Sequence, residues 1–165
     1  MKKRRTAFAP ACPPNTRVLV LGSLPGEASL AAREYYAHAH NGFWRLLGGV
    51  LDRPDLATLA YSDRLATINA AGIGLWDVYA SAERNGSLDQ AIRLGEIAPL
   101  AELIASMPDL RAVAFNGKLA AKAGRKAIGP TALALIDLPS SSPANAVIRF
   151  DAKLERWSAL KQFLI

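Results

Sequence analysis

The sequence contains almost none of the residues that bind metals most strongly. Cys12 is the only cysteine among 165 residues, which excludes an internal disulfide and any iron–sulfur or zinc site built on four cysteines. Histidine occurs only twice, as His38 and His40, which argues against a histidine-rich metal centre. We therefore expect no metal and no other cofactor. Catalysis by the protein's own side chains and simple binding are the function classes that are left.

Long apolar runs are also missing. No stretch approaches the roughly 20 apolar residues that are needed to cross a bilayer. Residues 8–14 are too few and too rich in proline for the apolar core of a signal peptide. With 51% hydrophobic and 21% charged residues the composition is ordinary for a globular protein, and we expect a cytoplasmic location.

A chain of this length has room for one domain with a buried core and little room for a second. We place a single α/β domain over residues 17–165 and a basic, proline-rich tail over residues 1–16. The start of the tail, residues 2–5, is interpreted as solvated and disordered. The formal net charge of +6 favours polyanionic partners, above all nucleic acid, although many basic proteins bind none.

The apolar pattern alternates between strands and helices along the chain. Strands are predicted over residues 17–22, 74–79, 111–116 and 131–138. Helices are predicted over residues 41–51, 56–71, 96–107, 118–127 and 151–164. Such alternation is typical of a parallel sheet with helices on both faces. The expected fold is therefore a three-layer αβα sandwich around a central four-stranded parallel sheet.

Polar segments stand at the carboxyl ends of all four predicted strands. They comprise residues 22–26, Asp77, residues 116–118 and residues 139–145. In a parallel sheet the working site lies beyond the carboxyl ends of the strands, so these segments are expected to gather on one rim. Residues 35–41 follow the first strand and can fold over the same rim. The sequence therefore predicts a site there.

Three side chains at this rim suit recognition of a nucleobase. The ring of Tyr36 could stack on a base, and core packing is the alternative. The amides of Asn41 and Asn116 each offer a donor and an acceptor, which could hold a water or read a base edge. The alternatives are a helix cap for Asn41 and a left-handed turn for Asn116.

Other rim groups suit anions. Backbone N–H groups between Ser23 and Gly26 could grip an anion or a base edge, and a tight turn is the alternative. Phosphate contacts are possible for three serines on a proline-stiffened loop and for one lysine that opens a helix, namely Ser140, Ser141, Ser142 and Lys118. The alternatives for these four are an ordinary turn and a solvated surface.

Asp77 is the one carboxylate that the topology places near the rim, where it could act as a base or cap a loop. The three tryptophans, Trp44, Trp76 and Trp157, lie in apolar surroundings, and we expect them in the core.

Several of these segments resemble motifs of the uracil-DNA glycosylase superfamily. Gly22-Ser-Leu-Pro-Gly26 is similar to its first motif, and Leu138-Pro-Ser-Ser-Ser142 is similar to its second. The stretch from Tyr36 to Trp44 resembles an aromatic-Ala-His-Pro-x-Asn-x-Phe-Trp segment of two branches, the mismatch-specific uracil/thymine-DNA glycosylases and the DNA-deoxyinosine (hypoxanthine-DNA) glycosylases. The second branch fits better, through Gly72-Ile-Gly-Leu-Trp-Asp77 and Ala114-Phe-Asn-Gly-Lys118.

Two positions depart from these patterns. Leu24 stands where the mismatch-specific enzymes carry their catalytic asparagine, so the resemblance implies that Asn41 takes this role. Ala39 replaces the usual proline of the third segment.

The resemblance implies a monofunctional DNA glycosylase of base excision repair. Such an enzyme flips a deaminated base out of DNA and hydrolyses its N-glycosidic bond. Hypoxanthine is the expected base, with uracil and xanthine next, and we expect the protein to be a monomer. Tyr36, Asn116, Ser23 and Gly26 would contact the base, while Ser140, Ser141, Ser142 and Lys118 would contact DNA. The alternatives are a non-catalytic nucleic-acid-binding domain of the same fold and an enzyme that acts on free nucleosides.

Overall fold

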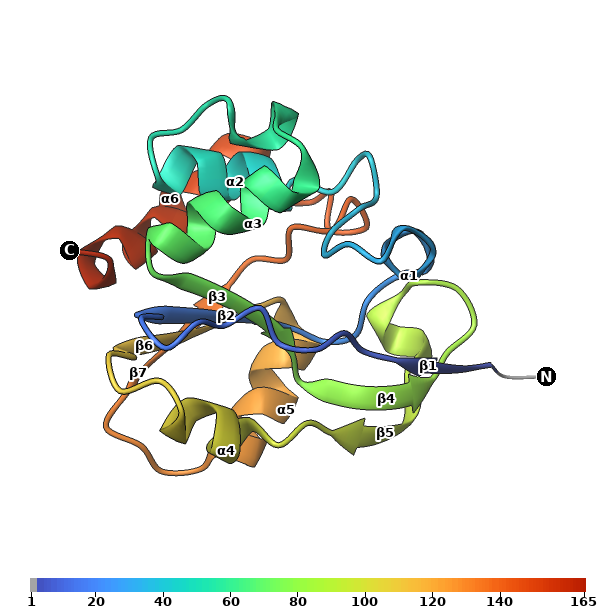
Figure 1. Ribbon diagram of the computed structural model, residues 1–165. Coiled ribbons are helices and arrows are strands. Elements are labelled where there is room, and N and C mark those ends of the chain that lie inside the picture. The colour runs from blue at the N-terminus through green and yellow to red at the C-terminus, as the bar shows by residue number, and fades with distance from the viewer. Residues whose placement is uncertain (1–2) are drawn as a thin grey trace.

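Four parallel strands form the centre of the molecule (Figure 1). The computed structural model describes residues 3–165, and it orders these strands β3-β2-β6-β7. Their bounds are Val18–Gly22 for β2, Ile73–Asp77 for β3, Ala112–Asn116 for β6 and Ala134–Leu138 for β7. All neighbouring pairs in this sheet are parallel. The predicted parallel sheet is thus confirmed.

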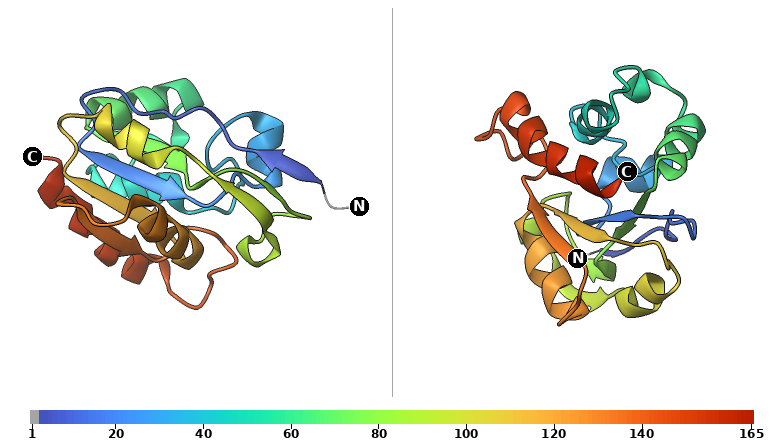
Figure 2. Two further views of the ribbon diagram at one scale, coloured as in Figure 1. Left: turned by 90° about the horizontal axis from the view of Figure 1, so that it is seen from below. Right: turned by 90° about the vertical axis from the view of Figure 1, so that its left-hand side faces the viewer.

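Helices cover both faces of this sheet. Their bounds are Glu27–Ala32 for α1, Phe43–Val50 for α2, Tyr61–Ala70 for α3, Leu100–Ala105 for α4, Lys118–Ile128 for α5 and Phe150–Trp157 for α6. Three short 3-10 helices lie between or after these elements, at Leu56–Thr58, Asp89–Ala91 and Ser158–Phe163. Figures 1 and 2 show α2, α3 and α6 on one face and α4 and α5 on the other, which confirms the three-layer sandwich.

The central strand β2 is buried along its whole length, and its side chains alternate between two cores. Val18 and Val20 pack in the core beneath α2, α3 and α6, while Leu19 and Leu21 pack in the core against α4 and α5. A strand that is covered on both faces needs an unbroken apolar run. This is why residues 18–21 carry no polar side chain.

A second, smaller sheet was not predicted. It is antiparallel, and its strands are β1 (Arg4–Thr6), β4 (Tyr79–Glu83) and β5 (Arg93–Ile97). The interpretation of residues 2–5 as a disordered tail is wrong for Arg4 and Arg5, because backbone pairing with β4 orders them; Lys2 lies outside the described residues. The helix predicted from residue 96 begins only at Leu100, because β5 continues to Ile97.

Cys12 is bound to the edge of the central sheet. Its neighbour Ala11 forms a β-bridge with Leu75, and the Cys12 thiol donates to the Leu75 carbonyl at 3.3 Å. Burial raises the pKa of this thiol to about 12, although the hydrogen bond acts in the opposite direction. The N-terminal segment is therefore anchored to β3 before β2 begins.

The three tryptophans lie in the core as predicted, and each indole N–H finds a backbone carbonyl. Trp76 donates to Phe8 at 2.9 Å. Trp44, on α2, donates to Tyr35 at 3.1 Å, and Trp157, on α6, donates to Pro139 at 2.9 Å. The last two bonds tie the packed helices to the loops that begin at Tyr35 and Pro139.

The substitution Trp157→Phe keeps an aromatic ring in the core but removes the donor to the buried Pro139 carbonyl. An unsatisfied buried polar group costs about 1–3 kcal/mol, and we expect urea unfolding to show a loss of this size. Trp76→Phe is the matched control, because its indole donates to the Phe8 carbonyl and makes no bond to the serine loop. Both variants should lose stability, and only Trp157→Phe should make residues 139–145 more sensitive to protease. An unfolding free energy within 0.5 kcal/mol of wild type, about the size of a neutral surface change, would contradict a structural role for this bond.

Candidate functional site

The site begins where β2 ends, at Gly22. Gly22 pairs with Asp77 at the end of β3. A Cβ atom at Gly22 would lie 2.6 Å from the Asp77 Oδ1 and 2.8 Å from the Tyr36 hydroxyl oxygen. Neither contact is sterically possible, so only glycine allows this carboxyl and this hydroxyl to approach the strand end together.

Tyr36 is held in an unusual conformation. Its φ of 56° is left-handed, which is uncommon for a residue with a side chain and costs backbone energy that the surrounding contacts must offset. One face of its ring stacks on Phe43, with 3.7 Å between the ring centroids. Its hydroxyl is buried and has no hydrogen-bond partner within residues 3–165. Burial, and secondly the charge of Asp77, raise the pKa of Tyr36, so the hydroxyl stays neutral.

Asn41 lies directly before α2. Its Oδ1 accepts the Phe43 N–H at 3.0 Å, so the predicted capping interaction exists, although Gly42 occupies the cap position itself. The Asn41 Nδ2 group has no acceptor in the part of the chain described. The next residue, Gly42, donates its N–H to the Ser141 carbonyl at 3.0 Å. This bond joins the loop of residues 35–42 to the serine loop, residues 139–145.

Asn116 binds the serine loop from the opposite side. Its Nδ2 donates to the Ser141 Oγ, and its Oδ1 accepts the Ser141 N–H, both at 2.9 Å. Asn116 is 7% exposed and Ser141 3%. Asn116 and Ser141, both predicted site residues, therefore hold the rim together. Each keeps only part of its hydrogen-bonding capacity for a ligand.

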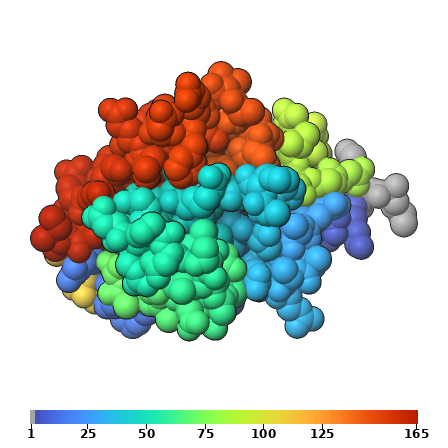
Figure 3. Space-filling model, turned by 90° about the horizontal axis from the view of Figure 1, so that it is seen from above, coloured from blue at the N-terminus to red at the C-terminus, as the bar shows by residue number. Residues whose placement is uncertain are grey.

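The remaining predicted phosphate contacts lie nearer the surface. The hydroxyls of Ser140 and Ser142 accept N–H groups of their own loop, both at 3.2 Å. Lys118 is exposed at the start of α5, and the preceding Gly117 donates to the Leu138 carbonyl at 3.1 Å. Figure 3 shows the face on which the residues around 40 (cyan) meet those around 140–150 (orange). The structure thus gathers these groups on the predicted rim.

The loop of residues 22–26 presents backbone donors. Ser23 is buried and donates its hydroxyl to Asp89 Oδ1 at 2.5 Å. The N–H groups of Ser23, Leu24 and Gly26 have no acceptor within residues 3–165. Leu24 is 6% exposed, so its side chain offers packing and no polar group, and only its backbone N–H can bind a ligand.

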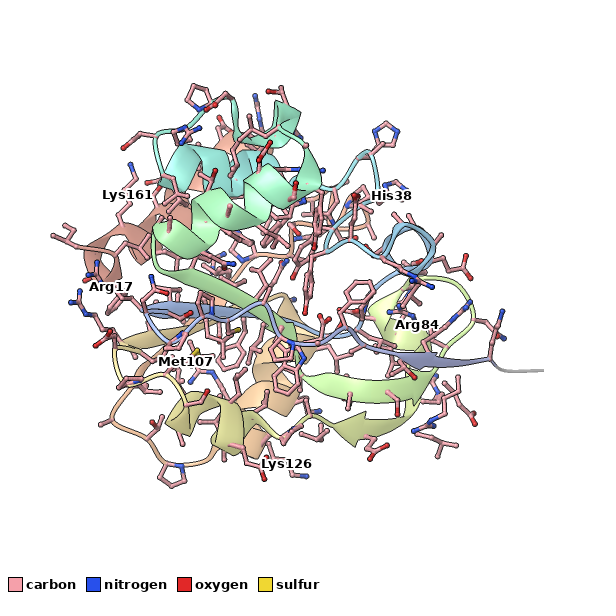
Figure 4. The ribbon with its side chains drawn as sticks, viewed as in Figure 1. Arg17, His38, Arg84, Met107, Lys126 and Lys161 are labelled. Atoms are coloured by element: carbon pink, nitrogen blue, oxygen red, sulfur yellow. The ribbon has the colours of Figure 1, made fainter. Side chains whose placement is uncertain are left out.

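Arg84 supports this loop, and sequence reasoning missed it. Its guanidinium is 1% exposed and donates to the Pro25 carbonyl, while its Nε and Nη1 have no partner among the described residues (Figure 4). Burial lowers the pKa of Arg84, and the neighbouring Asp89 opposes this shift. A lone arginine after a strand carries no sequence signal of burial, because the loop that covers it is distant in the chain.

Asp77 is 3% exposed, and its Oδ2 has no hydrogen-bond partner in residues 3–165. Burial raises its pKa to about 7; Arg84 opposes the shift and Asp89 adds to it. Asp77 therefore exists in both protonation states near neutral pH, beside Tyr36.

The two histidines lie outside this cluster. His38 and His40 are exposed, and Figure 4 shows His38 pointing away from the domain. Within residues 3–165 no group of three His, Cys, Asp or Glu side chains is arranged to hold a metal ion. No helix in this range is long and apolar enough to span a membrane.

These features define an α/β protein whose site lies at the carboxyl rim of a parallel sheet and is built from neutral amides, a tyrosine and backbone donors. The family model of the Uracil DNA glycosylase superfamily matches residues 9–161. The chain belongs to this superfamily.

Three relatives agree with this assignment. The chain is 42% identical over 118 residues to the hypoxanthine DNA glycosylase of Methanosarcina barkeri, which covers 72% of this chain and 73% of the relative. It is 38% identical over 147 residues to the hypoxanthine DNA glycosylase of Methanosarcina acetivorans, covering 88% and 90%. A solution NMR structure of a Methanosarcina acetivorans protein assigned as a uracil DNA glycosylase is also similar, with a TM-score of 0.85 and 34% identity over 98% of this chain and 99% of that one.

The raised pKa of Asp77 predicts how Asp77→Asn changes stability with pH. Because the folded pKa lies above the unfolded value, the folded carboxylate costs stability as the pH rises from about 4 to about 7. Asparagine removes this cost. We expect its advantage over wild type in urea unfolding to be roughly 2–3 kcal/mol larger at pH 8 than at pH 5. Asp109→Asn, which removes an exposed carboxylate outside the site, is the control. An equal effect of Asp77→Asn at both pH values would show that Asp77 titrates normally.

Proposed function

We propose that this protein is a monofunctional DNA glycosylase of base excision repair that removes hypoxanthine, and with lower preference uracil or xanthine, from DNA. The observation that carries the proposal is the convergence of three loops at one rim: Tyr36 lies against Gly22, and Gly42, which follows Asn41, binds Ser141 of the serine loop. The Gly42–Ser141 bond holds Asn41, which carries an uncharged amide, beside the serine loop. Membership of the superfamily and the named activity of the two Methanosarcina relatives support the same function.

In this proposal the target nucleotide flips out of the DNA double helix. This costs a few kcal/mol, and the cost is smallest for a mispaired or damaged base. The Tyr36 face opposite Phe43 takes the base, because Phe43 fixes the ring orientation. The remaining hydrogen-bonding capacity of Asn116 reads the base edge. Tyr36 is a neutral donor throughout, since burial keeps its hydroxyl protonated.

Asn41 places the attacking water. Its Oδ1 accepts the Phe43 N–H, which fixes the amide and directs the free Nδ2 group toward substrate or water. Cleavage of the N-glycosidic bond transfers the bonding electrons to the base, which departs as an anion while the sugar becomes cationic. The free N–H groups of Ser23, Leu24 and Gly26 are suited to stabilise this anion, as in other sites where backbone donors face developing negative charge.

The rest of the DNA binds outside the site that takes the base. Ser140, Ser142 and Lys118 contact backbone phosphates, and the two hydrogen bonds between Asn116 and Ser141 hold the serine loop in place. We expect one protein molecule to act alone on its substrate, without a metal or cofactor.

Asn41→Ala removes the amide without changing the core, because Asn41 is only partly buried. We expect cleavage of a deoxyinosine duplex to slow by roughly 100- to 1,000-fold, the usual loss for one positioned catalytic group. The matched control is Asn15→Ala, which changes an exposed asparagine at the opposite end of the sheet and should leave the rate unchanged. An unaltered rate in Asn41→Ala would remove this residue from the mechanism.

The base and the reaction type are tested with duplexes that contain hypoxanthine, uracil or xanthine. Strand breaks should appear only after alkali, because the proposed reaction leaves an intact abasic site. Tight binding of these duplexes without breaks would favour a non-catalytic binding domain. Cleavage of free nucleosides with no action on duplexes would favour a nucleoside hydrolase.

A further inference from the structure

A half-open cavity of about 190 Å³, with a mixed apolar and polar lining, lies beside the serine loop. Its walls come from the start of α2, the serine loop and the start of α6, and they include Gly42, Arg45, Ser142, Asn145 and Lys153. No aspartate or glutamate is among the described residues that line it. At roughly 30 Å³ per water molecule the cavity has room for several waters or one tetrahedral anion.

Lys153 is the most unusual residue of this cavity. It is 7% exposed, although lysine is almost never fully buried without a partner. Its ammonium forms no ion pair and donates no hydrogen bond within residues 3–165. Two basic residues on the same C-terminal stretch of the chain do have acids: Lys161 lies 3.5 Å from Asp52 and Arg149 lies 3.7 Å from Asp151. Burial lowers the pKa of Lys153, which agrees with a cation that lacks a counter-charge.

Arg45 provides a second cation without an acid. Its guanidinium lies 4.6 Å from the ring centroid of Phe150, the first residue of α6. The ring orients the guanidinium without using its N–H groups, and no carboxylate pairs with it in the described chain. A planar guanidinium that keeps its donors free is suited to bind two oxygens of a phosphate.

The cavity adjoins the candidate active site. Gly42 forms part of its wall, and Gly42 directly follows Asn41 and donates to Ser141. An anion in the cavity therefore lies beside whatever nucleotide faces Asn41. On a DNA strand the anion at this position is a backbone phosphate next to the target nucleotide.

We propose that this cavity binds one backbone phosphate adjacent to the flipped nucleotide, with Lys153 and Arg45 as its cationic ligands. The proposal rests on the proposed function and adds a defined anion site to it. Phosphate supplies the counter-charge that Lys153 lacks in the free protein. Binding of the strand and positioning of the target nucleotide against Asn41 are then coupled through Gly42.

The test compares Lys153→Met with Lys153→Arg in binding to a labelled deoxyinosine duplex over a range of salt concentrations. The measurements use an Asn41→Ala background, so that the DNA stays intact. Lys153→Met should weaken binding about tenfold, which is the effect of one hydrogen bond to a charged group. It should also lower the slope of log K against log salt concentration by about 0.9, because one fewer counterion is released. Lys153→Arg should retain most of the slope.

Lys161→Met is the matched control, because Lys161 does not line the cavity and pairs with Asp52. It should change neither affinity nor slope by a comparable amount. Unfolding in urea provides a second check. Lys153→Met keeps the buried stem apolar and removes only the unpaired ammonium at the cavity, so stability should be equal to or higher than that of the background.

The position of the phosphate is tested with duplexes in which one neutral methylphosphonate stands 5′ or 3′ of the deoxyinosine. One of the two should weaken binding about tenfold with Lys153 present and less than twofold in Lys153→Met. Equal, additive losses at both positions would overturn the localised site. So would an unchanged salt slope in Lys153→Met. Stabilisation of the protein by inorganic phosphate, with unchanged DNA affinity in Lys153→Met, would assign the cavity to a free anion instead.

These outcomes are separable from a failure of the proposed function. If the wild-type protein cleaves deoxyinosine DNA and Lys153→Met keeps the full salt slope, only the phosphate site is wrong. If no modified duplex is cleaved by the wild-type protein, the function is wrong whatever the salt slope shows.

Discussion

The candidate site depends on the way in which one residue, Ser141, is held. Its N–H and hydroxyl both bind the amide of Asn116, and its carbonyl accepts the N–H of Gly42. Asn116 ends a central strand and Gly42 starts the helix α2, so a single buried serine connects the sheet to the loop that carries Asn41. Trp157 adds a fourth attachment at Pro139, the first residue of the serine loop. Because buried hydrogen bonds of this kind are costly to break, the loops are fixed before any ligand arrives.

Much of the fold could be predicted because the buried strands carry strong, unbroken apolar signals. Residues 18–21 are an example, since both faces of β2 are covered. The small antiparallel sheet could not be predicted in the same way. Every residue of β5, Arg93–Ile97, is exposed, so its sequence shows no alternation, and β1 has only three residues. Both strands are stabilised by pairing with β4, which lies 75–79 residues from its partners in β1 and 10–18 residues from its partners in β5, and local patterns do not contain these contacts.

The sequence was enough to predict which segments meet at the site. It was less able to predict which hydrogen bonds their side chains form. The rule that parallel strands end at a common rim was enough to bring Gly22, Asp77 and Asn116 together. It could not reveal that the Asn116 amide is used on Ser141, because both residues are equally suited to contact a ligand. The two buried basic residues were missed: Arg84 and Lys153 resemble surface residues in the sequence, and only the packing of distant segments covers them.

The environment of Cys12 has a practical consequence for spectroscopy. A thiolate is the species that reacts with maleimides and similar probes, and a thiol with a pKa of about 12 is almost entirely protonated in neutral buffer. The native cysteine can therefore remain in place while a new one is introduced for labelling. Val147, which is 94% exposed just after the serine loop, is a favourable position for a fluorophore. A dye attached there would report the binding of a nucleic acid at the rim in real time. Cys12 would carry no dye, so the signal would come from this one position.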